Sequence, residues 1–119
     1  MSSQDQAPYV AVCPECDATR RTDEPNEVID FYRRHYRVTG HDVEIDRADP
    51  DHDGDVTAKD LKGVVRQLED EYRNGVPIGV VAAAMHRRGL SVSETLDEIH
   101  DVRMGGGLYE PQDDHLAAF

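Results

Sequence analysis

Two cysteines and two histidines near the start of the chain have the types and spacing of metal ligands. Cys13 and Cys16 are separated by two residues, Cys16 and His35 by eighteen, and His35 and His41 by five. Zinc takes four thiolate and imidazole ligands in tetrahedral geometry, and a Cys-x2-Cys turn places two sulfurs close together. The sequence therefore predicts one zinc ion bound by Cys13, Cys16, His35 and His41.

A helix after Pro25 is needed to bring the histidines to the cysteines. Its predicted inner face contains apolar and aromatic residues at helical spacing, and His35 falls on the same face; these residues are Val28, Ile29, Tyr32 and Tyr36. Gly40 suits a left-handed helix stop, which would turn His41 back toward the cysteines. We therefore expect both histidines to converge on the cysteine turn.

Together with the run HYRVTGH, the four residues resemble a two-Cys two-His zinc finger of the ββα kind, whose helix ends in a His-x5-His element. The resemblance covers about a third of the chain and implies a small zinc-stabilised module. The gap between the second cysteine and the first histidine is longer than in the common finger, which predicts a longer β-hairpin. Two alternatives stay open: a redox-active Cys-x-x-Cys, and a buried thiol pair beside a core histidine.

The charge balance is strongly acidic, with 25 Asp and Glu against 13 Lys and Arg and a formal net charge of −12. This balance, with arginine far more frequent than lysine, resembles that of proteins from salt-loving archaea. Acidic clusters therefore have a ready explanation as hydrated surface. The sequence contains no apolar run of membrane length and no secretory signal segment, so we expect a cytoplasmic protein without a membrane partner.

A twelve-residue acidic segment, DPDHDGDVTAKD, fits the register of a calcium loop. The oxygen ligands would come from Asp49, Asp51, Asp53, Asp55 and Asp60, and Gly54 would take the sharp turn. Against this, the preceding residues are patterned as a strand, and Thr57 with Asp60 would cap the next helix without an ion. We favour a charged linker and keep a calcium-binding module as an alternative.

The chain as a whole is predicted to be α+β, a small ββα-type zinc finger followed by a winged helix-turn-helix domain. The predicted divisions are a disordered lead-in, the finger, an acidic linker and the winged helix, at residues 1–8, 9–47, 48–56 and 57–119. Alternating Val43 and Ile45 predict a strand that pairs with Tyr9–Cys13. Three helices follow, from Thr57, from Pro77 and from the capping box Ser91–Glu94, before a C-terminal hairpin.

The run GLYEPQDDHLAAF, preceded by SETLDEIHDVRM, is similar to the small winged-helix domain at the C-terminus of archaeal minichromosome maintenance helicases. The resemblance covers Thr57 to Phe119, about half of the chain. It implies only the module, because no ATPase core accompanies it here.

Function is less constrained than fold. Candidate contacts to double-stranded DNA are arginines on the finger helix and at the ends of two later helices, Arg33, Arg34, Arg37, Arg87, Arg88 and Arg103. The third winged-helix helix is acidic instead, which favours a protein-interaction adaptor. We expect a non-enzymatic accessory factor of transcription or replication, with DNA association slightly ahead of the adaptor. No nucleophile–base set or phosphate loop predicts an enzyme.

Overall fold

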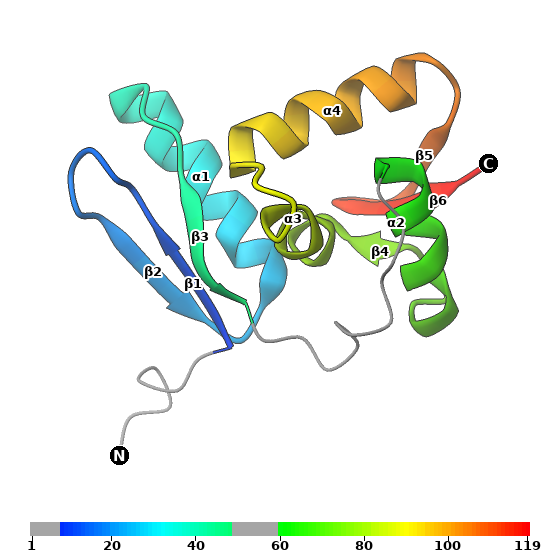
Figure 1. Cartoon of the computed structure of the whole chain (residues 1–119), viewed down its shortest axis with the longest axis horizontal. Helices are drawn as coiled ribbons and strands as arrows, with labels where there is room; N and C mark the ends of the chain where they lie inside the picture. The colour runs from blue at the N-terminus through cyan, green and yellow to red at the C-terminus, as the bar shows by residue number, and fades with distance from the viewer. Residues whose placement is uncertain (1–7, 49–59) are drawn as a thin grey trace.

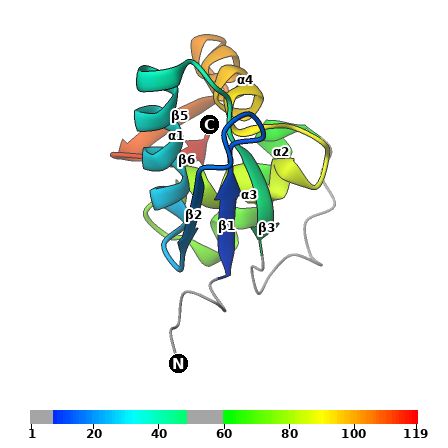
Figure 2. The same cartoon turned by 90° about the vertical axis from the view of Figure 1, so that its left-hand side faces the viewer.

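The computed structural model describes residues 8–48 and 60–119 (Figure 1). The N-terminal part is a small three-stranded sheet covered by one helix, in the order β1 (Tyr9–Val12), β2 (Thr19–Thr22), α1 (Pro25–Thr39) and β3 (Glu44–Ala48). Figure 2 shows the sheet face-on with β1 in the middle, and both of its neighbours run antiparallel to it. The predicted pairing of the strand around Ile45 with β1 is confirmed.

The C-terminal part contains three helices, a 3-10 turn and a second small sheet. Its elements are α2 (Leu61–Leu68), η3 (Glu69–Glu71), β4 (Val76–Pro77), α3 (Ile78–His86), α4 (Val92–Met104), β5 (Leu108–Gln112) and β6 (His115–Ala118). The sheet order is β4-β6-β5, all antiparallel. The predicted α+β class and the order of three helices followed by a hairpin are confirmed, and β4 is a strand that the sequence did not predict.

Local signals explain most of the helix boundaries. Pro25 occupies the first turn of α1, and Gly40 ends that helix with φ of 75°. At the start of α4, the Ser91 hydroxyl accepts from the Glu94 amide and the Glu94 carboxylate accepts from the Ser91 amide, as the predicted capping box requires. By contrast, α2 begins only at Leu61, with Asp60 at its cap position but no side-chain cap bond. Thr57 lies outside the described residues.

The two parts share one hydrophobic core. It combines buried residues of the first sheet and α1 with those of all three later helices and β6, and α3 lies at its centre with Ile78 to Met85 buried. Figure 1 shows α1 between the first sheet and the helices of the C-terminal part. Burying a side chain such as Ile29 stabilises the fold by about 1.5–3 kcal/mol, so both parts depend on their contact with each other.

Gly79 marks the closest approach between the two parts. A Cβ atom at this position would overlap the backbone carbonyl of Pro25 and would lie 2.9 Å from the amide nitrogen of Asn26. The Gly79 amide donates to the Asn26 side-chain oxygen at 2.8 Å, while the Asn26 side-chain amide donates to the Asp114 carbonyl at 3.0 Å. Asn26 therefore joins the start of α1 to both α3 and the turn between β5 and β6.

Asp42 makes a second junction, beyond the C-terminal end of α3. Its carboxylate accepts from the Ser91 hydroxyl at 2.6 Å and from the Ser93 amide at 3.0 Å, and the Val92 amide donates to the Val43 carbonyl at 3.1 Å. The first turn of α4 is thus capped from the N-terminal part of the chain. Within residues 8–48 and 60–119, no helix combines the length and apolar composition needed to cross a lipid bilayer.

Candidate metal centre and charged surfaces

The turn after β1 positions both cysteines. The Cys13 amide donates to the Ala18 carbonyl at 2.8 Å, and the Asp17 amide donates to the Cys13 carbonyl at 3.1 Å. Asp17 takes a left-handed conformation with φ of 61°, which closes the turn within a few residues. Cys13 is buried against the core, Cys16 is exposed at the tip, and both thiols are free.

The C-terminal end of α1 supplies the histidines. His35 lies in the last turns of the helix, where the Thr39 hydroxyl donates to its carbonyl at 2.7 Å. The same hydroxyl accepts from the His41 amide at 3.1 Å, just after the chain reverses at Gly40. The Phe31 ring stacks on the His35 ring with centroids 5.5 Å apart. The Phe31 ring thus orients the His35 imidazole, and the Thr39 hydroxyl holds the His41 backbone in place after the chain reverses.

The four side chains meet as predicted. Cys13 Sγ lies 3.6 Å from His41 Nδ1, Cys16 Sγ lies 3.2 Å from His35 Nε2, and all four ligand atoms fall within 4.8 Å of one another. Tetrahedral zinc, about 2.3 Å from sulfur and 2.0 Å from nitrogen, separates adjacent sulfur and nitrogen ligands by about 3.5 Å. The cluster therefore has the dimensions to hold a metal ion.

The chemistry of the cysteines also suits a cation. The backbone amide of Ala18 lowers the pKa of the Cys16 thiol, but the hydrogen bond with Cys13, removal from water and nearby negative charge together raise the pKa above its usual value. Two adjacent thiolates repel each other, and a bound cation offsets that repulsion. A set of four protein ligands is typical of structural sites, because catalytic zinc keeps one position open for water or substrate.

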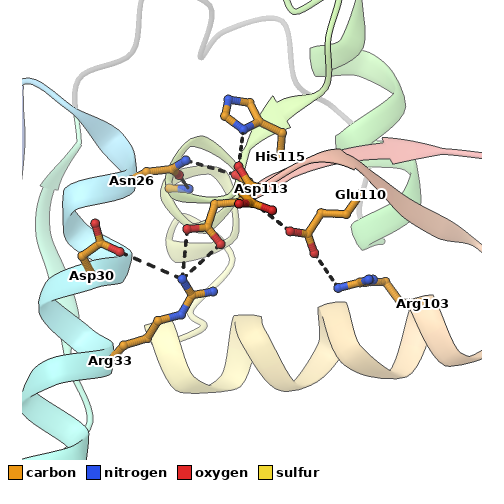
Figure 3. A network of polar contacts seen from close by, with 9 residues as sticks. Asn26, Asp30, Arg33, Arg103, Glu110, Asp113 and His115 are labelled. Carbon is orange, nitrogen blue, oxygen red and sulfur yellow. Dashed lines mark hydrogen bonds and ion pairs between the residues drawn. The ribbon is translucent and has the colours of Figure 1, made fainter.

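Two of the predicted DNA-contact arginines are engaged within the protein, as Figure 3 shows. Arg33 on α1 donates from one nitrogen to both carboxylate oxygens of Asp114 at 3.0 Å, and Arg103 on α4 forms an ion pair with Glu110 at 2.7 Å. The second Glu110 oxygen accepts from the Asp114 amide at 2.9 Å. The β5–β6 turn, which would form the wing, is thus fastened to α1 on one side and to α4 on the other.

The other four arginines lie elsewhere. Arg34 and Arg37 are exposed on the outer side of α1, and Arg87 is exposed just after α3. Arg88 donates back to the Ala84 carbonyl at 2.8 Å. Arg33, which belongs with Arg34 and Arg37 by sequence, is held by Asp114 in the β5–β6 turn.

The outward side of α4 is acidic. Glu94, Asp97 and Asp101 recur at helical spacing and are exposed, and we call them the acidic stripe. Glu98 lies beside the stripe and is half-buried. The predicted calcium ligands Asp49, Asp51, Asp53 and Asp55 lie outside the described residues, and Asp60 is exposed at the start of α2.

Two family models match this chain, in sequence order. Residues 10–47 match the family described as HVO_B0008 N-terminal, and residues 66–116 match the family described as HVO_B0008 C-terminal domain. The chain is similar to both halves of that pair. The first match contains all four candidate metal ligands, and the second runs from α2 to β6. Searches among curated proteins and among solved structures found no match.

Proposed function

We propose that this protein is a zinc-stabilised, non-enzymatic module that docks a protein partner through the acidic stripe of α4. The observation that supports this most directly is the surface of α4: the third helix of the C-terminal part, which a DNA-binding winged helix would place in the major groove, presents Asp97 and Asp101 to solvent. Carboxylates facing phosphates would weaken binding, whereas they complement a basic protein surface.

The arrangement of the wing turn supports the same proposal. A wing that contacts DNA needs free cations, but the turn here is acidic, and Asp114 is already bound by Arg33. Arg103, the cation of α4, faces Glu110. Using either arginine for phosphate contact would require breaking an ion pair that joins two elements of the fold.

Zinc is the metal that best fits the ligand set. Thiolates and imidazoles in tetrahedral spacing suit zinc better than they suit magnesium or calcium, which prefer oxygen ligands. In this position the ion would hold the β1–β2 turn against the end of α1. Its role would be structural, and elemental analysis of the purified protein should find one zinc per chain.

DNA association through α1 is the second candidate, because Arg34 and Arg37 are exposed on one side of that helix. At 1 M salt, charge repulsion is screened beyond about 3 Å. The negative net charge of the protein would therefore not prevent short-range contacts between these arginines and DNA phosphates. A role in transcription or replication stays a prediction under either candidate.

Paired charge reversals separate the two candidates. Asp97→Arg with Asp101→Arg should abolish capture of a defined protein partner in a native-salt pull-down, while Glu44→Arg with Asp46→Arg, on the exposed side of β3, should leave it intact. Arg34→Glu with Arg37→Glu should also leave capture of the protein partner intact. DNA association would instead be established if the wild-type protein binds duplex DNA across a potassium chloride series. That binding should be lost in Arg34→Glu with Arg37→Glu and kept in Asp97→Arg with Asp101→Arg.

A further inference from the structure

A cavity of about 400 Å³ lies where the two parts of the fold meet. The N-terminal part contributes Tyr9 of β1 and residues 23–26 around the start of α1, and the C-terminal part contributes Tyr72, Pro77 and His115. None of these residues belongs to the candidate metal centre or to α4. Junctions between structural units are preferred places for ligand sites, so this cavity is a candidate for one.

Aromatic and proline rings form much of the cavity wall. Tyr9 is 7% exposed and Tyr72 is half-buried, so both rings are held by the fold. Pro25 and Pro77 are also half-buried and have stiff rings. A wall of this kind loses little conformational entropy when a ligand covers it. Tyrosine rings also attract cations, because the face of an aromatic ring is electron-rich.

Two polar side chains at the cavity have roles that the fold already assigns. Asn26 uses its oxygen to accept from the Gly79 amide and its nitrogen to donate to the Asp114 carbonyl. His115 Nδ1 lies 2.7 Å from the Asp113 carbonyl, which can only accept, so Nδ1 carries the proton (Figure 3). Nε2 of the neutral His115 ring is therefore an acceptor, and a complementary ligand must donate.

Negative charge at the cavity comes from Asp23 and Glu24, which are both exposed. Among the residues that the structure describes, no lysine or arginine lines the cavity to neutralise them. Carboxylates, an imidazole acceptor and aromatic rings together select a cation. A compact cation such as an unsubstituted ammonium is strongly hydrated, and rings cannot replace its water. An alkylated ammonium instead contacts aromatic rings through its methyl groups.

We propose that this cavity binds an alkylated ammonium group, a cation with an apolar outer surface. The Tyr9 and Tyr72 rings contact the methyl groups, and the carboxylates of Asp23 and Glu24 offset the charge. The same group occurs in free small molecules and in methylated lysine side chains of other proteins. The proposal does not rest on the proposed function, because no lining residue belongs to α4.

An NMR titration of the amide signals of the complete protein, at one fixed potassium chloride concentration, tests the proposal. Choline is the probe, and 3,3-dimethylbutanol is its neutral match of the same shape. Choline should shift the amide signals of Tyr72 and His115 with a dissociation constant in the millimolar range, as expected for so small a ligand. The alcohol should bind at least about tenfold more weakly. Equal binding of the two compounds, or no choline-dependent shift at these amides, would overturn the proposal.

A blocked peptide with trimethyllysine between two glycines identifies the source of the group. Binding of this peptide that is no tighter than that of choline would assign a free small molecule, because the cavity then recognises the ammonium group alone. Binding at least about tenfold tighter than that of choline would assign the side chain of a protein partner. Both outcomes support the site, and they differ only in what occupies it.

Matched substitutions then locate the contact. Tyr72→Leu removes the aromatic face and should weaken choline binding by about fivefold or more, whereas Tyr72→Phe keeps the face and should change it by less than about twofold. Asp23→Asn with Glu24→Gln should also weaken binding by about fivefold or more. Asp97→Asn with Asp101→Asn removes the same charge from α4 and is the control, with an expected change below about twofold. Equal losses in the two charge variants would overturn the proposal, and this comparison decides even if Tyr72→Leu does not fold.

Discussion

Replacing Gly79 with alanine should separate the two parts of the fold. The added Cβ would overlap the Pro25 carbonyl and crowd the Asn26 amide, and all of these neighbours are backbone atoms of α1 that cannot rotate away. Relief requires moving the start of α1, which would also lengthen or break the Gly79–Asn26 hydrogen bond of 2.8 Å.

The magnitude follows from three contributions to the free energy of unfolding. Overpacking costs about 1–3 kcal/mol, and the upper end applies where the clash is with backbone. Loss of the hydrogen bond costs about 0.5–1.5 kcal/mol. The higher helix propensity of alanine returns up to about 1 kcal/mol. The net expectation is a destabilisation of about 2.5–4.5 kcal/mol, which corresponds to a fall of roughly 10–15 °C in the melting temperature for a domain of this size.

Thermal and urea unfolding followed by circular dichroism, at one fixed salt concentration, would measure the effect. Gly105→Ala is the matched control, because a Cβ there would meet only the Asp101 and Val102 carbonyl oxygens at 3.6 and 3.7 Å, which is ordinary contact. If Gly79→Ala and Gly105→Ala have melting temperatures within about 2 °C of each other, the close packing of α1 on α3 is not as described.

Three more predictions concern the metal site, the contact that Asn26 makes between α1 and α3, and stability in acid. Chelation of the metal, or Cys16→Ser, should lower the melting temperature of the whole chain in a single transition, since the two parts share one core; two separate transitions by calorimetry would contradict this. Asn26→Ala should cost about 1–3 kcal/mol in urea unfolding, because it leaves the half-buried Gly79 amide and Asp114 carbonyl without their partner. Hydrogen bonds from Thr22 and then from Arg20 lower the pKa of Glu27, so its contribution to stability is complete above the unfolded-state pKa of about 4.3 and is lost as the pH falls through the lower folded-state value. Glu27→Gln should therefore flatten the acid side of the stability–pH curve, and an unchanged curve would refute the assignment.

The local features of the fold were predictable because short segments of sequence encode them. The Cys-x2-Cys turn, Pro25 at the start of α1, Gly40 at its end and the capping box at Ser91 all act within a few residues. The metal cluster was predictable for the same reason, since two local motifs each carry half of the ligands. The burial of α3 also has a local signal, because the eight consecutive residues from Ile78 are all apolar or glycine, and all eight are buried.

The contacts between the two parts were not predictable from one sequence. Asn26 and Gly79 are 53 positions apart, and Arg33 and Asp114 are 81 apart, so no periodic pattern connects them. Asn26 had no signal beyond its place in the first turn of a helix. Arg33 appeared available for DNA because it lies on the polar side of α1, and only the folded arrangement brings Asp114 of the β5–β6 turn to it. The two-residue strand β4 is too short to produce an alternating pattern.

The capping of α4 by Asp42 has a consequence for how the chain is made. During synthesis the N-terminal part leaves the ribosome first. Asp42 can bond to Ser91 and Ser93 only after about fifty more residues have been synthesised. Until then α1 exposes the face that will cover α3, and the nascent chain has no complete core to bury it against. We expect ribosome-bound chains that end before α4 to be digested rapidly by protease, and protection to appear only once β6 has emerged.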